Sequence, residues 1–251
     1  MNNAAQVIAA LKSFAKPEKA AQMASFFKTG KGQYAEGDIF WGLTAPEMKT
    51  IVKKFYKDIS FAEIQNLLDS PVHEQRSAGL QCLVAKFAKA DKSARNEITD
   101  FYLRNTKAVN NWDLVDTTAP YILGAWVLEN DNLEHNWRLA QSKELWQERI
   151  AVVSTWYLIR NNVFAPTIAL AEHFLGHKHD LMHKAVGWML REVGKRDEKV
   201  LIAFLDKNAS IMPRTMLRYA LERLSPDRRK FYMQKKAVSY THLTLPTKLE
   251  V

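Results

Sequence analysis

The sequence predicts an all-α fold in which antiparallel helix pairs stack into an α-solenoid. Two observations favour helices: the 251 residues include only 9 Gly and 8 Pro, and runs that alternate apolar and polar residues are few. The third observation is a weak repeat of 34 to 37 residues, in which equivalent positions of successive helix pairs hold Arg76, Trp112, Arg149, Lys184 and Arg218. A period of this length, built from helix pairs, is typical of a solenoid with a concave face.

Apolar residues at helical spacing, separated by short connections, predict the individual helices. Pro46 suits the first position of one helix, and Ser60 with Glu63 forms a capping box that begins the next. Residues 28–44 contain four glycines and several aromatic residues, so we expect a loop that serves as a contact surface. The predicted helices span residues 4–15, 19–27, 46–56, 61–68, 71–87, 92–105, 133–141, 144–159, 166–175, 180–193, 198–208 and 213–224, with a further helical segment beginning at Trp112.

The chain is expected to form one domain over residues 1–238. Residues 239–251 are β-branched and turn-rich without an apolar stripe, and they are similar to a translated cloning adaptor, so they are left out of the fold argument. The single cysteine, Cys82, excludes an internal disulfide framework and suits a reducing cytosol. The N-terminus lacks the pattern of a signal peptide, and no apolar run approaches the roughly 20 residues that span a bilayer. We therefore expect a cytoplasmic protein without a membrane partner.

The net charge of +9 indicates a polyanionic partner such as nucleic acid, although a merely solvated basic surface is the alternative. Four of the five repeat positions are Arg or Lys, so a row of cations along the concave wall can follow a phosphate backbone; alternatively, these residues bridge neighbouring repeats. Residues 214–236 add a net charge of +6, which favours a terminus that binds a duplex over a solvated helix pair.

The segment from Asn110 to Pro120 has the strongest local pattern for a binding site. Asn111 suits an N-cap, which places Trp112 and Asp116 four residues apart on one helix face and Asp113 in the first turn. An indole beside a carboxylate suits a cationic ligand. In isolation, the same residues also fit an ordinary buried tryptophan and a capping aspartate.

Two sequence motifs support a binding site here. One is Trp112-Asp113-Leu114-Val115-Asp116, and the other runs from Lys184 to Glu192 and reads Lys-Ala-Val-Gly-Trp-Met-Leu-Arg-Glu. Together with the segment around Arg149, they resemble the AlkD-like DNA alkylation repair glycosylases over roughly residues 4–236. The resemblance implies a superhelix of HEAT-like repeats that excises positively charged N3- or N7-alkylated purines from duplex DNA. It further implies that the base is not flipped into a pocket, whereas ordinary glycosylases flip their base.

The resemblance also implies roles for individual residues. Asp116, Trp112 and Trp188 match the residues that line the site at the damaged nucleotide, and Arg149 matches a residue that contacts DNA. The early loop matches more loosely. The remaining DNA-binding candidates are Lys184, Arg191, Tyr34, Lys49 and Arg218.

The residue types suit this chemistry, because a carboxylate stabilises the oxocarbenium-like sugar that forms as a cationic base leaves. Asp116 can alternatively orient a water molecule. No metal or nucleotide cofactor is implied, and a monomer in contact with the nucleoid is expected. His173, His177, His179 and His183 have spacings that can chelate a metal, but surface turns commonly carry histidine. The rival functions are a non-catalytic protein that binds DNA structures and a protein-binding scaffold.

Overall fold

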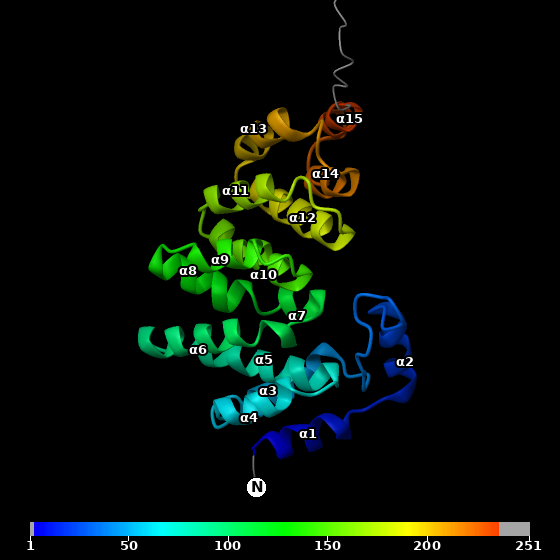
Figure 1. Cartoon of the computed structure of the whole chain (residues 1–251), viewed down its shortest axis with the longest axis vertical. Helices are drawn as coiled ribbons and strands as arrows, with labels where there is room; N and C mark the ends of the chain where they lie inside the picture. Colours follow the sequence, from blue (N-terminus) through cyan, green and yellow to red (C-terminus); the bar gives the residue numbers. More distant parts are fainter. Residues whose placement is uncertain (1–2, 236–251) are drawn as a thin grey trace, which may run out of the picture.

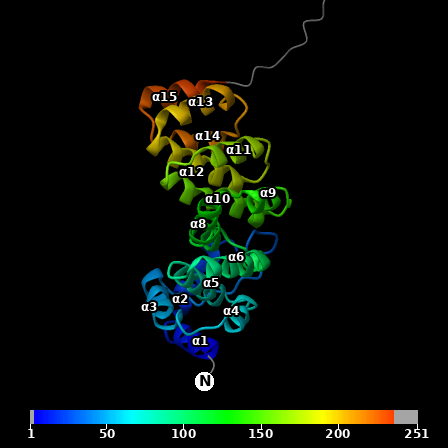
Figure 2. The ribbon, with the colours of Figure 1, turned by 90° about the vertical axis from the view of Figure 1, so that its left-hand side faces the viewer.

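Helices are stacked from the N-terminus to the C-terminus in an elongated array that curves around one side (Figures 1 and 2). This computed structural model describes residues 3–235, and the predicted adaptor-like tail at 239–251 lies outside them. Within the described range the secondary structure is helical, apart from an isolated bridge between Ile39 and Val72. The predicted all-α, solenoid-like fold is therefore confirmed. No helix of residues 3–235 combines the length and the apolar composition that crossing a membrane requires.

The N-terminal half contains the helices that form one wall of the curve. They are α1 (Asn3–Ser13), α2 (Pro17–Phe26), α3 (Ala45–Phe55), α4 (Phe61–Leu68), α5 (His73–Phe87) and α6 (Lys92–Arg104), followed by the 3-10 turn η1 (Thr106–Ala108) and the short α7 (Trp112–Asp116). The capping box at Ser60 and the N-cap at Asn111 are present as predicted. Side-chain caps such as these satisfy backbone N–H groups that have no partner inside the helix.

The C-terminal half continues the stack. Its elements are η2 (Pro120–Gly124), α8 (Ala125–Asn130), α9 (Glu134–Ala140), α10 (Leu145–Arg160), α11 (Ala165–His173), α12 (Asp180–Arg196), α13 (Glu198–Asn208), α14 (Arg214–Leu221) and α15 (Pro226–Gln234). The sequence did not predict η2, a π-helical turn in which Gly124 donates its backbone N–H to Ala119 O, five residues back. The turn brings Gly124 so close to α10 that a Cβ atom would lie 2.1 Å from Ser154 O.

A continuous apolar core runs along the stack and holds the curve rigid. Helices α10 and α12 lie at its centre, with Ile150 and Met189 among their fully buried side chains. Cys82 is 1% exposed and belongs to the core, as its apolar neighbours predicted. Close-packed interiors deform little, so side chains on the concave side are held by a firm scaffold.

The loop of residues 28–44 is fastened to the concave side by a buried carboxylate. Glu74, in the first turn of α5, accepts backbone N–H bonds from Trp41 at 2.9 Å, Gly42 at 2.8 Å and Leu43 at 3.3 Å. Gly42 has a φ of 86°, and a Cβ there would lie 2.5 Å from Lys16 O, so the position requires glycine. As a result, the loop between α2 and α3 lies beside α7 (Figure 1).

Candidate functional site

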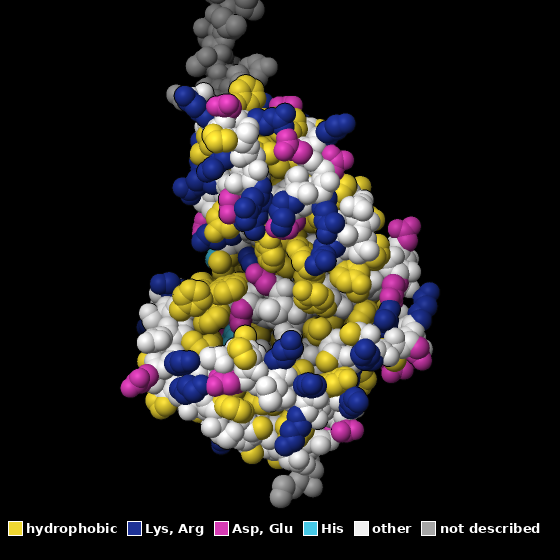
Figure 3. All heavy atoms as spheres, turned by 180° about the vertical axis from the view of Figure 1, so that it is seen from behind, with side chains coloured by type: hydrophobic (Ala, Val, Ile, Leu, Met, Phe, Trp, Pro, Cys, Tyr) yellow, Lys and Arg dark blue, Asp and Glu magenta, His cyan; other side chains and the backbone are white. Residues whose placement is uncertain are grey.

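The concave side of the stack carries a groove of about 860 Å³. Its walls come from α2, the end of the loop, α3, α5, α7 and η2, and its lining includes Lys49, Glu74, Asp113, Asp116 and Tyr121. Seen from behind, the molecule is hollowed between its two halves, with hydrophobic and acidic side chains in the hollow and many Lys and Arg side chains above it (Figure 3). An apolar cleft with a few convergent charged groups is the usual form of a ligand site.

Asp116 lies at the edge of this groove and is held by Arg149 of α10. Arg149 Nη2 donates to both carboxylate oxygens at 2.9 Å, and Arg149 Nε donates to Oδ1 at 3.1 Å. Arg149 Nη1 donates to Leu181 O at 2.7 Å, so the guanidinium also joins α10 to α12. The Arg149 side chain is 5% exposed, whereas that of Asp116 remains 19% exposed. A guanidinium that is held in this way fixes the orientation of the carboxylate.

Burial raises the pKa of Asp116 to about 6, against the opposing charge and hydrogen bonds of Arg149. The nearby Asp113 also raises this pKa. The Asp116 carboxyl is therefore mainly ionised at neutral pH but titrates close to it. Perturbed carboxyl groups of this kind are common at sites that stabilise charge.

Trp112 is half-buried and lies among other aromatic rings. Its indole stacks on Phe27 with centroids 5.1 Å apart and contacts the exposed Phe26 edge-on at 5.9 Å. Trp112 Nε1 donates to the Tyr34 hydroxyl at 3.3 Å, and the Tyr34 ring meets Trp146 edge-on at 5.9 Å. The loop thus reaches across to α7 and α10. Phe26, Phe27 and Trp146 were not predicted as site residues, because contacts between distant segments depend on how the loop folds.

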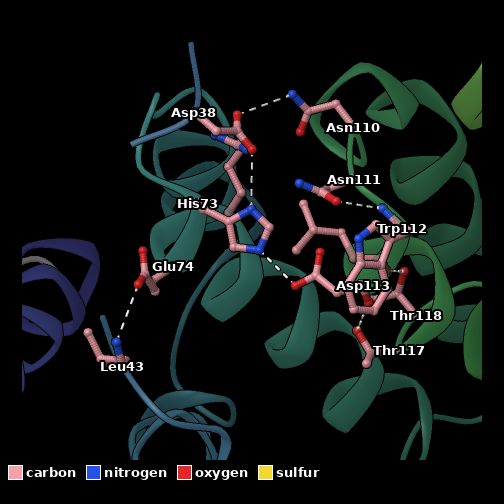
Figure 4. A network of polar contacts seen from close by, with 12 residues as sticks. Asp38, Leu43, His73, Glu74, Asn110, Asn111, Trp112, Asp113, Thr117 and Thr118 are labelled. Carbon is pink, nitrogen blue, oxygen red and sulfur yellow. Dashed lines mark hydrogen bonds and ion pairs between the residues drawn. The ribbon is translucent and has the colours of Figure 1, made fainter. Parts of the chain in front are cut away.

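Asp113 belongs to a buried polar network rather than serving only as a first-turn carboxylate (Figure 4). His73 Nε2 lies 2.8 Å from Asp113 Oδ2, and His73 Nδ1 lies 3.3 Å from Asp38 Oδ2. Asp38 also accepts a bond of 2.7 Å from Arg76 Nη2. The network joins the loop, α5 and α7 beneath the groove.

The predicted row of cations is divided in two. Arg76 and Arg149 are 4% exposed and bridge neighbouring elements through Asp38 and Asp116. For these two residues, the alternative of bridges between repeats therefore holds. Arg218 is exposed, and Lys184 is partly exposed with an ion pair to Asp180 at 2.7 Å. Buried arginines satisfied by carboxylates are poorly placed to contact phosphates, so any phosphate contact along this row falls to Lys184 and Arg218.

Of the other predicted site residues, Lys49 lines the groove, whereas Arg191 and Trp188 lie on α12 and are not among the residues that line it. Lys49 is exposed at its wall, and Arg191 of α12 pairs with Glu192 and Glu222. Trp188 is half-buried against the core on α12, and within residues 3–235 no ring contact joins it to Trp112. In the basic C-terminal segment, Arg228 pairs with Glu198, while Lys236 lies outside the described residues.

The histidine cluster is occupied by bonds of its own. His177 Nε2 lies 3.0 Å from Glu148 Oε2, His183 Nε2 lies 2.6 Å from His177 O, and His179 Nδ1 accepts the Leu181 N–H as the cap of α12. Among the described residues, no group of three or more His, Cys, Asp or Glu side chains is arranged to hold a metal ion.

A basic, all-α stack with an aromatic and acidic groove on its concave side defines a class of helical-repeat proteins suited to polyanionic partners. Within this class the family is specific: residues 7–224 match the DNA alkylation repair enzyme family, and the chain belongs to it. A solved structure described as a predicted DNA alkylation repair enzyme from Enterococcus faecalis has a similar fold, with a TM-score of 0.68 and 18% sequence identity. The alignment covers 84% of this chain and 97% of that chain. A search among curated proteins found no match. Family membership assigns the chain a role in DNA alkylation repair.

Proposed function

We propose that the chain is a DNA glycosylase that hydrolyses the N-glycosidic bond of positively charged N3- or N7-alkylated purines in duplex DNA. The observation that carries the proposal is that Asp116 of α7 lines the groove, with Trp112 on the same short helix, in a member of the DNA alkylation repair family.

In the proposed reaction, Asp116 stabilises the sugar. An alkylated purine already carries a positive charge, so it leaves readily, and the positive charge then develops on the sugar in an oxocarbenium-like state. The carboxylate, held by Arg149 and 19% exposed, faces this charge from a site of low polarity, where electrostatic stabilisation is strongest. Water then completes the hydrolysis, and no residue of the chain forms a covalent bond with the sugar.

The indole of Trp112 provides a face for the cationic nucleotide, worth about 1–2 kcal/mol by cation–π attraction. Trp188 is proposed to provide a second aromatic surface from α12 once the duplex lies in the groove. Lys49, Lys184, Arg191 and Arg218 are proposed to contact phosphates around it. Arg149 is reassigned from a phosphate contact to the orientation of Asp116, since its guanidinium is buried and paired.

The experiment is incubation of the full chain with duplex DNA that contains 7-methylguanine or 3-methyladenine, followed by chromatography of the released bases. The proposal expects free methylated base and a matching number of abasic sites. Recovery of unmodified guanine within intact DNA would instead indicate removal of the methyl group. Tight binding without release would favour the non-catalytic alternative.

A further inference from the structure

His73 is almost completely buried, with 2% exposure, yet both of its ring nitrogens face carboxylates. Nε2 lies 2.8 Å from Asp113 on α7, and Nδ1 lies 3.3 Å from Asp38 in the loop. Only a protonated imidazole donates from both nitrogens, so the imidazolium is the form that satisfies both partners. The pair of contacts joins two segments that are far apart in the sequence and both border the groove (Figure 4).

Three charged groups face this imidazole: Asp38 from the loop, Asp113 from α7 and Arg76 from its own helix, α5. Burial works against a charge on His73, but the hydrogen bonds to Asp113 and Asp38 outweigh it and raise its pKa to about 9. A buried ion that loses its partner is costly, so removal of either carboxylate from His73 should destabilise the network.

A cluster of rings leads from the same imidazole to Trp112. Phe40 and Phe27 both contact His73, with centroids 4.5 Å and 5.3 Å away, and they stack on each other at 5.0 Å. Trp112 in turn stacks on Phe27 at 5.1 Å with an interplanar angle of 19°. Trp112 is also the chain neighbour of Asp113. His73 therefore contacts the Trp112 region by two routes, one polar and one aromatic.

We propose that His73 is a positioning residue for the excision reaction: by joining Asp38 of the loop to Asp113 of α7, it fixes the indole of Trp112, the chain neighbour of Asp113, against Phe27 and Tyr34. The effect of His73 on the excision rate rests on the proposed glycosylase function, whereas its effect on the position of the Trp112 indole does not. Neutral imidazole can donate to only one of the two carboxylates, so deprotonation releases either the loop or α7 and lets the indole move.

The first test follows the indole without any need for activity. The full chain is labelled with 5-fluorotryptophan, and the fluorine NMR signal of Trp112 is assigned by its loss in Trp112→Phe. We expect this signal to shift between pH 7 and pH 10 with a midpoint near 9, and to lie elsewhere, without that titration, in His73→Gln. A Trp112 signal that neither titrates in the wild type nor moves in the variant would overturn the proposal.

The second test measures single-turnover excision of 7-methylguanine. In His73→Gln the rate of the folded fraction should fall on the order of tenfold, because small misplacements of site groups slow reactions strongly. Affinity for undamaged duplex should stay unchanged, since His73 is buried. Asp38→Asn breaks the same link and also leaves Arg76 without its carboxylate, so it should lose at least as much. If His73 acts through Asp38, the double variant should lose no more than the worse single variant.

His135→Gln is the matched control, because His135 packs on Trp126 outside the groove and should leave the rate unchanged. A His73→Gln rate equal to that of the wild type would refute the kinetic role. If the wild type releases no base at all, the proposed function fails, whereas the fluorine signal still decides whether His73 positions Trp112.

Discussion

Asp116→Asn is the substitution that most directly examines the proposed chemistry. The amide keeps the size of the side chain and one acceptor oxygen for Arg149, but it removes the negative charge. For a sugar cation roughly 4 Å from the carboxylate, and an effective dielectric constant of about 20, the lost attraction is about 4 kcal/mol. Arg149 remains in both proteins, so its repulsion of the cation cancels in the comparison. A barrier higher by about 4 kcal/mol corresponds to a rate lower by roughly 10³.

The assay is single-turnover release of 7-methylguanine at several pH values, with a melting curve for each protein. Because the pKa of Asp116 is raised to about 6, the wild-type rate should increase with pH, reach half of its maximum near pH 6 and level off about one pH unit higher. The variant should be slow, and its rate should not show this increase with pH. Its melting temperature should also fall, since Arg149 keeps a buried charge without a full partner.

Equal plateau rates for wild type and Asp116→Asn, measured on the folded fraction, would refute the electrostatic role. If the variant is slow but its rate still increases with pH near 6, a group other than Asp116 titrates there.

The remaining predictions concern the partners of this site. Arg149→Gln removes a charge that lowers the pKa of Asp116, so the pH at which the rate is half-maximal should move above 6. Asp113→Asn breaks the buried contact with His73 and should cost about 2–3 kcal/mol of unfolding free energy, measured in urea, rather than the smaller loss of a simple cap. Because the pKa of His73 is raised, its protonation stabilises the folded chain. This stabilisation is fully present below the ordinary pKa of 6.5 and is lost as the pH rises through about 9. The melting temperature of the wild type should therefore fall over that range more than that of His73→Gln. Duplex affinity should decrease steeply with salt concentration, and Lys184→Gln should reduce the slope of log K against log salt by about 1.

Local signals in the sequence predicted most of the helices, but α8 and α15 were missed. Ser60 and Glu63 form their capping box, and Asn111 caps α7, because both patterns act between residues close in sequence. The π-helical turn η2 was missed, because it arises where Gly124 packs closely against α10, a contact that no local pattern contains.

The candidate site was predicted only in part, because its strongest contacts join distant segments. The repeat pattern placed Arg76 and Arg149 on the solenoid correctly, but it did not indicate that carboxylates at Asp38 and Asp116 neutralise them. Likewise, Tyr34 was identified as a site residue, yet the bond that it accepts from Trp112 spans 78 positions and depends on the folded loop. Residue types therefore identified candidate residues, whereas their pairing and burial had to come from the structure.

If Asp116 binds a cationic sugar in the groove, the chain should distinguish abasic-site analogues by their charge. Two duplexes are compared: one carries a neutral tetrahydrofuran abasic site, and the other carries a pyrrolidine whose ring nitrogen is positively charged. Mimics of a transition state bind an enzyme more tightly than mimics of its ground state. We expect the wild type to prefer the cationic duplex by roughly 10²–10³ in Kd, and Asp116→Asn to remove this preference. Equal Kd values of the wild type for the two duplexes would contradict this expectation.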